Sequence, residues 1–138
     1  MSMDGRLREP PYPFQDQVGF TIDDWQPDYC RLSQPMLNHL GNRYGVPHGG
    51  VMATLLDTAL AFAVCYTGNP DDKQLVMTLS INVQFHSVAR GDMLITEGRK
   101  TGGGRSVAFA EGEVKDENDN LIATATAVFK YRTGKGKP

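Results

Sequence analysis

Residues 48–65 read HGGVMATLLDTALAFAVC, and this stretch decides the fold. From residue 51 to residue 65 every side chain is apolar except Thr54, Asp57 and Thr58. A segment that is apolar on nearly all sides is typical of a buried helix. The sequence therefore predicts one central helix, which begins at the Gly49 and Gly50 pair.

Asp57 is the one carboxylate within this apolar stretch. Burying an unpaired charge is costly, so a carboxylate in such a helix is expected to be paired, hydrogen-bonded or chemically active. Thr54, Asp57 and Thr58 share one stripe of the helix, and hydroxyl groups or a structural cation could therefore satisfy the acid without any catalysis. Both interpretations remain open from the residues alone.

Composition predicts one soluble globular domain. The 138 residues carry a formal net charge of -2, with 22% charged and 40% hydrophobic residues, so nothing favours a nucleic-acid or membrane partner. The apolar run is too short to span a bilayer and no leader precedes it, so we expect a cytoplasmic protein. Cys30 and Cys65 form neither a disulfide framework nor a metal-binding spacing, so we expect both thiols to be reduced and structural.

Residues 75–86 show the clearest strand pattern, with apolar residues at odd positions and polar residues at even positions. Such alternation is typical of a strand with one buried face. It predicts Leu75, Met77 and Leu79 on the core face and Thr78 on the polar face.

Four further segments favour strands. An interrupted strand or hairpin is expected within residues 18–32, with a bend at Pro27, and single strands are expected at 93–100, 105–115 and 121–132. Ala123, Ala125 and Ala127 share one face of the last strand, and such small residues allow a helix to approach a sheet closely.

These elements predict an α+β fold in which one long helix is wrapped by an antiparallel sheet of about five to six strands. Residues 1–17 are polar, proline-rich and irregular, which indicates an N-terminal arm. We expect the domain at residues 18–132 and a flexible tail at residues 133–138.

Residues 42–50 read NRYGVPHGG, and Asp57 follows in the helix. This pattern resembles the hotdog-fold acyl-CoA thioesterases, most closely the phenylacetic acid degradation type, which show an Asn, a Gly three residues later, His-Gly-Gly and a helical Asp. The segments SINVQF (80–85), RGD (90–92) and GRSVAF (104–109) are also similar. The resemblance covers about residues 18–131 and implies a hotdog fold.

The resemblance implies cofactor-free hydrolysis of an acyl-CoA, in which Asp57 serves as general base or as nucleophile. The Gly49 N–H would polarise the thioester carbonyl, and Asn42 would hold the carbonyl or the water. Thr78 stands where some relatives have a water-positioning Ser, and its extra methyl group restricts the hydroxyl. The remaining residues assigned to the site are His48, which suits a loop-fixing hydrogen bond, and Gly50, Arg90, Arg105 and Ser106 for CoA.

The anion sites for CoA phosphates are expected among basic residues near the strand ends. Arg90, Arg99, Lys100 and Arg105 fall there, beside the backbone N–H groups of residues 102–104. The same charges could equally form a solvated edge.

Helix geometry predicts a dimer. Gly49 and Asp57 are eight residues apart, about 12 Å along a helix, so one thioester cannot contact both in one chain. Two antiparallel helices related by a two-fold axis would place Gly49 of one chain against Asp57 of the other. The resemblance implies the same interface site, and dimers of this family commonly pair into tetramers.

Two other functions compete with hydrolysis. A non-catalytic acyl-CoA binding protein of the same fold would use Asp57 only to hydrogen-bond its ligand. A hydratase would pair an Asp with a His, but His48 and Asp57 lie about two and a half turns apart, which does not suit that pairing.

Overall fold

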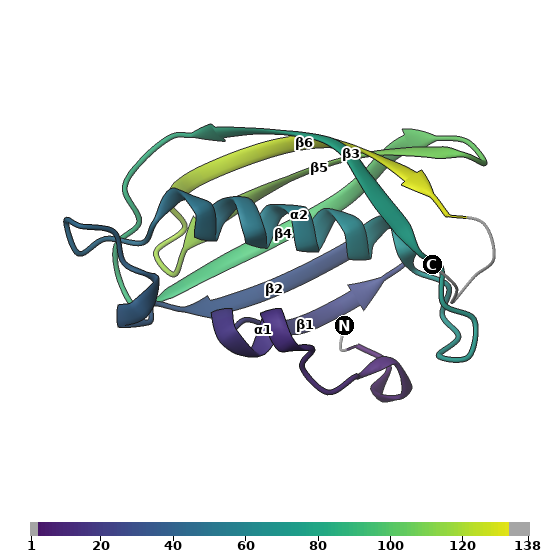
Figure 1. Cartoon of the computed structure of the whole chain (residues 1–138), viewed down its shortest axis with the longest axis horizontal. Helices are drawn as coiled ribbons and strands as arrows, with labels where there is room; N and C mark the ends of the chain where they lie inside the picture. Colours follow the sequence, from purple (N-terminus) through teal and green to yellow (C-terminus); the bar gives the residue numbers. More distant parts are fainter. Residues whose placement is uncertain (1–2, 133–138) are drawn as a thin grey trace.

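The computed structural model describes residues 3–132 and has one long helix packed on one antiparallel sheet. The helix α2 spans Gly49–Cys65 and crosses the concave face of the sheet (Figure 1). The strands are β1 (Thr21–Gln26), β2 (Tyr29–Pro35), β3 (Val76–Phe85), β4 (Met93–Gly103), β5 (Val107–Asp116) and β6 (Leu121–Tyr131), in the spatial order β1-β2-β4-β5-β6-β3. The predicted hotdog architecture is confirmed, including the first hairpin, which turns at Pro27.

The N-terminal arm is more ordered than its composition indicates. It contains a 3-10 turn, η1 (Gly5–Leu7), and a short helix, α1 (Pro13–Val18). Met3 and Leu7 are 8% and 4% exposed, so the arm contributes apolar side chains to the protein interior. The predicted tail at 133–138 lies outside the described residues.

The sheet allows α2 to come very close because small residues line its concave face. Ala123, Ala125 and Ala127 are at most 4% exposed, as the sequence pattern predicts. Gly98 of β4 and Gly112 of β5 are cross-strand partners beneath the middle of the helix. A Cβ atom at Gly98 would stand 2.9 Å from the carbonyl carbon of Ala59, so only glycine fits there.

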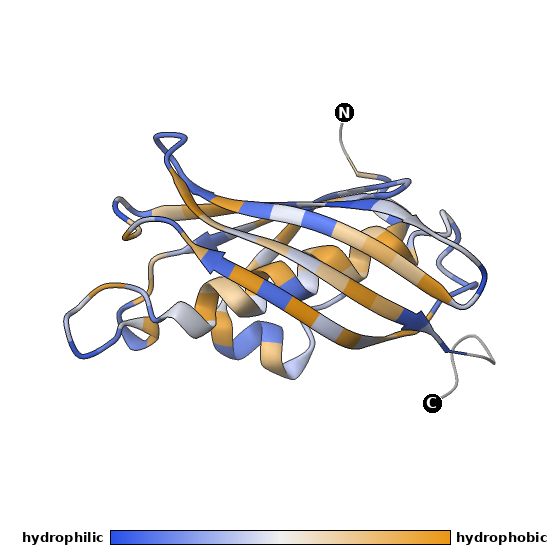
Figure 2. Ribbon diagram, turned by 90° about the horizontal axis from the view of Figure 1, so that it is seen from above, coloured by the Kyte–Doolittle hydropathy of each residue, from blue (hydrophilic) through white to orange (hydrophobic). Residues whose placement is uncertain are grey.

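The helix is buried on one side only, which differs from the prediction. Its sheet-facing residues include Leu55, Leu56 and Leu60, all 0% exposed. The opposite stripe is partly exposed along its whole length and comprises Gly50, Ala53, Thr54, Asp57, Thr58, Ala61, Phe62 and Cys65, which we call the open stripe. Figure 2 shows apolar residues along most of α2. The chain therefore leaves a largely apolar helix face partly exposed, and Asp57 lies on it.

Strand β3 does not follow the simple alternation of its sequence. Its register with β6 shifts between Thr78 and Ser80, which marks a β-bulge. One extra residue reverses the facing of the residues before it. The prediction for the first half of the strand is therefore wrong: Met77 and Leu79 are 49% and 51% exposed, and Thr78 turns toward the helix.

The close contact between Gly98 and α2 leads to a prediction about stability. Gly98→Ala is expected to lower the free energy of unfolding by about 1–3 kcal/mol, because the new methyl group would push α2 off the sheet. Gly104→Ala is the matched control, since a Cβ atom there meets nothing within 4 Å. Urea unfolding measures both, and equal stability of the two variants would contradict the close approach.

Candidate active site

Asp57 is held by a hydroxyl group from the neighbouring strand. Thr78 Oγ1 donates to Asp57 Oδ1 over 2.8 Å. The β3 bulge makes this contact possible, because it turns Thr78 to the helix side. Among residues 3–132, Asp57 Oδ2 has no hydrogen-bond partner, and the side chain is only partly buried. One oxygen of this carboxylate on the open stripe is thus fixed, while the other has no hydrogen-bond partner among these residues.

The two threonines of the helix do not satisfy Asp57, as one interpretation of the sequence allowed. Thr54 Oγ1 donates instead to the carbonyl oxygen of Gly50 over 2.9 Å. Within the part of the chain described, three or more His, Cys, Asp or Glu side chains nowhere gather in a group that could hold a metal ion. Among residues 3–132, the hydroxyl group that donates to Asp57 is thus that of Thr78 on β3, while the Thr54 hydroxyl is engaged with its own helix backbone.

His48 caps the start of α2. The His48 Nδ1 atom accepts a hydrogen bond from the Gly50 N–H over 2.8 Å. The backbone N–H of His48 donates to the carbonyl oxygen of Leu40. The loop-fixing role expected for His48 therefore agrees with these contacts. Because His48 occupies the Gly50 N–H, the Gly49 N–H is the first helical donor without an acceptor among residues 3–132. An N–H at the positive end of a helix dipole is suited to an oxyanion.

Asn42 shapes the loop that leads into this helix start. Its Oδ1 atom accepts from the N–H groups of Tyr44, at 2.9 Å, and Val46, at 3.4 Å. The carbonyl oxygen of Asn42 also accepts from Gly45, which has a φ of 80° that favours glycine. The side-chain amide group of Asn42 thus has its oxygen engaged in the turn, and only its NH₂ group remains as a donor for a ligand.

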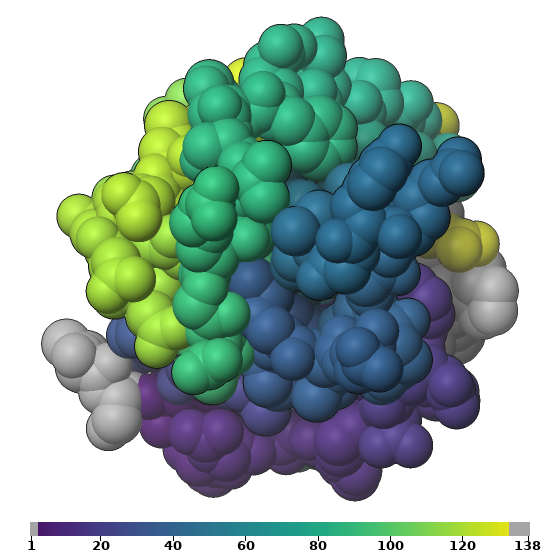
Figure 3. All heavy atoms as spheres, turned by 90° about the vertical axis from the view of Figure 1, so that its left-hand side faces the viewer, coloured from purple at the N-terminus to yellow at the C-terminus, as the bar shows by residue number. Residues whose placement is uncertain are grey.

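The structure collects the expected site residues into two groups. Asn42, His48, Gly49 and Gly50 lie at the N-terminal end of α2, where Phe85 packs beside Gly49. Figure 3 shows this end of the molecule, with the loop before α2 (blue) beside the loop after β3 (green). Asp57 and Thr78 form the second group in the middle of the helix, about 12 Å away at 1.5 Å per residue. No described contact joins the two groups within one chain.

The basic residues expected to hold CoA are not clustered. Arg90 precedes β4 and Arg105 with Ser106 follow it, so the length of this 11-residue strand, about 36 Å, separates them. Arg90 lies toward the end where α2 begins. The carbonyl oxygen of Ser106 accepts from the backbone N–H of Tyr131. The Tyr131 hydroxyl group donates to the carbonyl oxygen of Val64, so Ser106 lies near the C-terminal end of α2. Within one chain Arg90 therefore lies apart from Arg105 and Ser106, and Arg99 is paired with Glu113.

Tyr12 is a site neighbour that the sequence analysis missed. Partial burial raises the pKa of its phenol, a hydrogen bond with Thr58 acts in the opposite direction, and the charge of Asp57 adds to the rise. The hydroxyl group of this arm residue thus lies near the open stripe. The position of Tyr12 could not be predicted, because the proline-rich sequence of the arm indicates irregular structure.

The chain was compared with known proteins. The family described as Thioesterase superfamily matches residues 44–123. An 89-residue match to the Pseudomonas aeruginosa protein PA0474 is 34% identical and covers 64% of each protein, so the chain spans less than two thirds of that relative. The medium/long-chain acyl-CoA thioesterase YigI of Escherichia coli is 28% identical over 133 residues, 85% of this chain and 84% of YigI.

A solved structure agrees with the fold. The Escherichia coli PaaI protein, from the phenylacetic acid degradation operon, superposes with a TM-score of 0.80 at 17% identity and covers 90% of this chain and 87% of its own. Among the described residues, every helix falls short of the length and apolarity that a membrane span requires.

The His48 cap can be tested by substitution. His48→Ala is expected to lower the free energy of unfolding by about 1 kcal/mol, because the Gly50 N–H loses its acceptor, and His48→Asn is expected to recover most of it. His86→Ala is the control, since the exposed His86 ring makes a surface hydrogen bond to the Thr124 hydroxyl group and caps no helix. Urea unfolding at one protein concentration measures all three, and parental stability of His48→Ala would argue against the cap.

Proposed function

We propose that this chain, which belongs to the thioesterase superfamily, hydrolyses the thioester of an acyl-CoA to a free acid and CoA. The observation that carries the proposal is the half-fixed carboxylate of Asp57. Its Oδ1 atom is held by Thr78, and its other oxygen has no hydrogen-bond partner among residues 3–132. The named activity of YigI, at 28% identity over 85% of this chain, supports the substrate class.

Asp57 acts on water or on the thioester itself. As general base, its free oxygen takes a proton from water while the water oxygen attacks the carbonyl carbon. The tetrahedral intermediate then expels the CoA sulfur, the carbon–sulfur bond breaks, and the thiolate gains a proton. As nucleophile, Asp57 would instead form an anhydride that water hydrolyses. In both routes Thr78 orients the carboxylate.

The carbonyl oxygen of the thioester needs a hydrogen-bond donor, and one chain alone does not supply such a donor near Asp57. The Gly49 N–H has the right chemistry, but it lies about 12 Å away along the same helix. A second chain with an antiparallel α2 brings its Gly49 to Asp57. We therefore infer a dimer with two equivalent sites, in which Asn42, His48, Gly49 and Gly50 of one protomer complete the site of the other.

Strand β3 is the edge that fits this dimer. It is ten residues long and carries no charged side chain, and within residues 3–132 it pairs only with β6. Such a long, neutral edge readily pairs with another strand, whereas the opposite edge, β1, is short and carries Asp23 and Asp24. Pairing of β3 with its symmetry mate would also cover the apolar open stripe. Further pairing of dimers into tetramers is consistent with the exposed Met77 and Leu79.

The catalytic role of Asp57 predicts a large loss on substitution. Asp57→Asn is expected to lower kcat for acyl-CoA hydrolysis by about 10²–10⁴-fold, because the amide can neither accept a proton nor attack. Thr78→Val is expected to lower kcat less, and Thr78→Ser to retain most of it, since only the valine removes the hydroxyl donor. Release of CoA, followed with a thiol reagent, measures all of these rates.

Asp71→Asn is the matched control, because Asp71 is exposed in the turn before β3. Turnover by Asp57→Asn at the rate of this control would contradict the proposal. If the parent protein binds acyl-CoA but hydrolyses none of a panel of thioesters, the chain is instead an acyl-CoA binding protein.

A further inference from the structure

We propose that the N-terminal arm forms the outer wall of an acyl-chain pocket, which accepts aliphatic chains and limits their length. The inference rests on the proposed function and adds the substrate class. A cavity of about 540 Å³ lies between the arm and the second half of α2, within the range of small-molecule sites. Its walls include Leu7 and Pro10 from the arm and Ala61, Phe62 and Cys65 from the helix.

The cavity adjoins the reactive carboxylate. Ala61 lies one helical turn beyond Asp57 on the open stripe, about 6 Å along the axis. Val76 also lines the cavity and stands two residues before Thr78, on the same face of β3. An acyl group whose carbonyl carbon is at Asp57 can therefore continue directly along the stripe into the cavity.

The chemistry of the lining favours a hydrocarbon chain. Burial raises the pKa of the Cys65 thiol to about 12, so this side chain is a neutral, apolar surface at physiological pH. The lining also includes polar side chains, among them Arg6, Arg8 and Asn69, and there Lys73 pairs with Glu9 at 3.0 Å and the Thr67 hydroxyl donates to the carbonyl oxygen of Asp72 at 2.7 Å. A polar substituent that lies against Ala61, Phe62 and Val76 would lose its water without gaining a hydrogen bond from these side chains.

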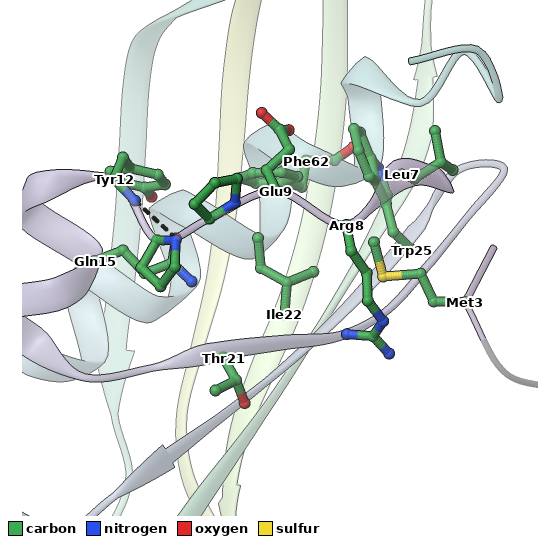
Figure 4. A pocket seen from close by; sticks show the side chains of 12 residues that line it. Met3, Leu7, Arg8, Glu9, Tyr12, Gln15, Thr21, Ile22, Trp25 and Phe62 are labelled. Atoms are coloured by element: carbon green, nitrogen blue, oxygen red, sulfur yellow. Dashed lines mark hydrogen bonds between the residues drawn. The ribbon is translucent and has the colours of Figure 1, made fainter. Parts of the chain in front are cut away.

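The wall of the pocket is firmly built. The Trp25 indole N–H donates to the carbonyl oxygen of Phe62 over 2.7 Å, and the two rings meet edge to face at 5.0 Å. Leu7 is only 4% exposed and lines the cavity with them. Trp25, Phe62 and Leu7 also line a second, smaller cavity of about 200 Å³, whose lining side chains are drawn in Figure 4. A fixed wall of this kind sets an upper limit to chain length.

The single tryptophan makes the pocket observable without catalysis, because Trp25 lies in its wall. Non-hydrolysable thioether analogues of acyl-CoA, from acetyl to palmitoyl, are titrated into the full-length protein while tryptophan fluorescence is recorded. We expect no shift with CoA or the acetyl analogue and a shift that grows with chain length up to a limit. Equal responses to CoA and to the long-chain analogues would overturn the proposal.

A filling substitution tests the same pocket through specificity. Ala61→Phe is expected to lower the ratio of kcat/KM for dodecanoyl-CoA over butyryl-CoA by roughly tenfold or more, because the ring occupies the chain's path. Thr126→Phe adds the same ring on the outer face of β6 and is expected to keep the parental ratio. Cys65→Phe is a second filling variant, which tests the pocket independently if Ala61→Phe does not fold. Circular dichroism checks that each variant folds.

The pocket assignment and the thioesterase activity can be tested separately. If thioesters are hydrolysed but the filling variants keep the parental chain-length profile, the pocket assignment is wrong and the hydrolase stands. If no thioester is hydrolysed and the fluorescence still responds to long chains alone, the pocket stands and the hydrolase is wrong.

Discussion

The hydrogen bond from Thr78 to Asp57 is the interaction on which the account of the site depends. It fixes one oxygen of a carboxylate that lies on a partly exposed, otherwise largely apolar helix face. It exists only because the β3 bulge turns Thr78 toward α2. A bulge removes one regular pairing position from a strand, and proteins often place bulges next to functional sites to redirect a side chain. The β3 bulge thus determines which side chain holds the Asp57 carboxylate.

A second constraint is the length of the helix. The rigid rise of an α-helix keeps the Gly49 N–H and the Asp57 carboxylate about 12 Å apart, and no local motion can bring them together. The helix must nevertheless lie tightly on the sheet, where Gly98 and Gly112 leave room for its backbone. The apolar open stripe, the neutral edge of β3 and this fixed separation all favour the same solution, a site shared by two chains. The N-terminal arm then closes the side of the stripe that β3 leaves open.

Much of the fold could be predicted because its signals are local. The apolar run at 51–65 and the small residues of β6 predict the helix and the surface on which it packs, and both are confirmed. The facing of Met77 and Thr78 could not be predicted, because a bulge depends on the partner strand and leaves no mark in the alternation. The scattering of Arg90 and Arg105 depends on which ends of β4 they flank. Tyr12 reaches the open stripe only through the packing of the arm, which its proline-rich composition conceals.

Complementation between two inactive variants tests the shared site most directly. Gly49→Pro removes the backbone N–H at the first helical position, where proline is well tolerated, and Asp57→Ala removes the acid. Each variant alone is expected to be nearly inactive. When they are unfolded together in equal amounts and refolded, mixed dimers hold one intact site each, so about a quarter of the parental activity should return. Gly49→Ala, which keeps the N–H, should retain activity by itself. No recovery in a mixture shown to contain mixed dimers would contradict a site built from two chains.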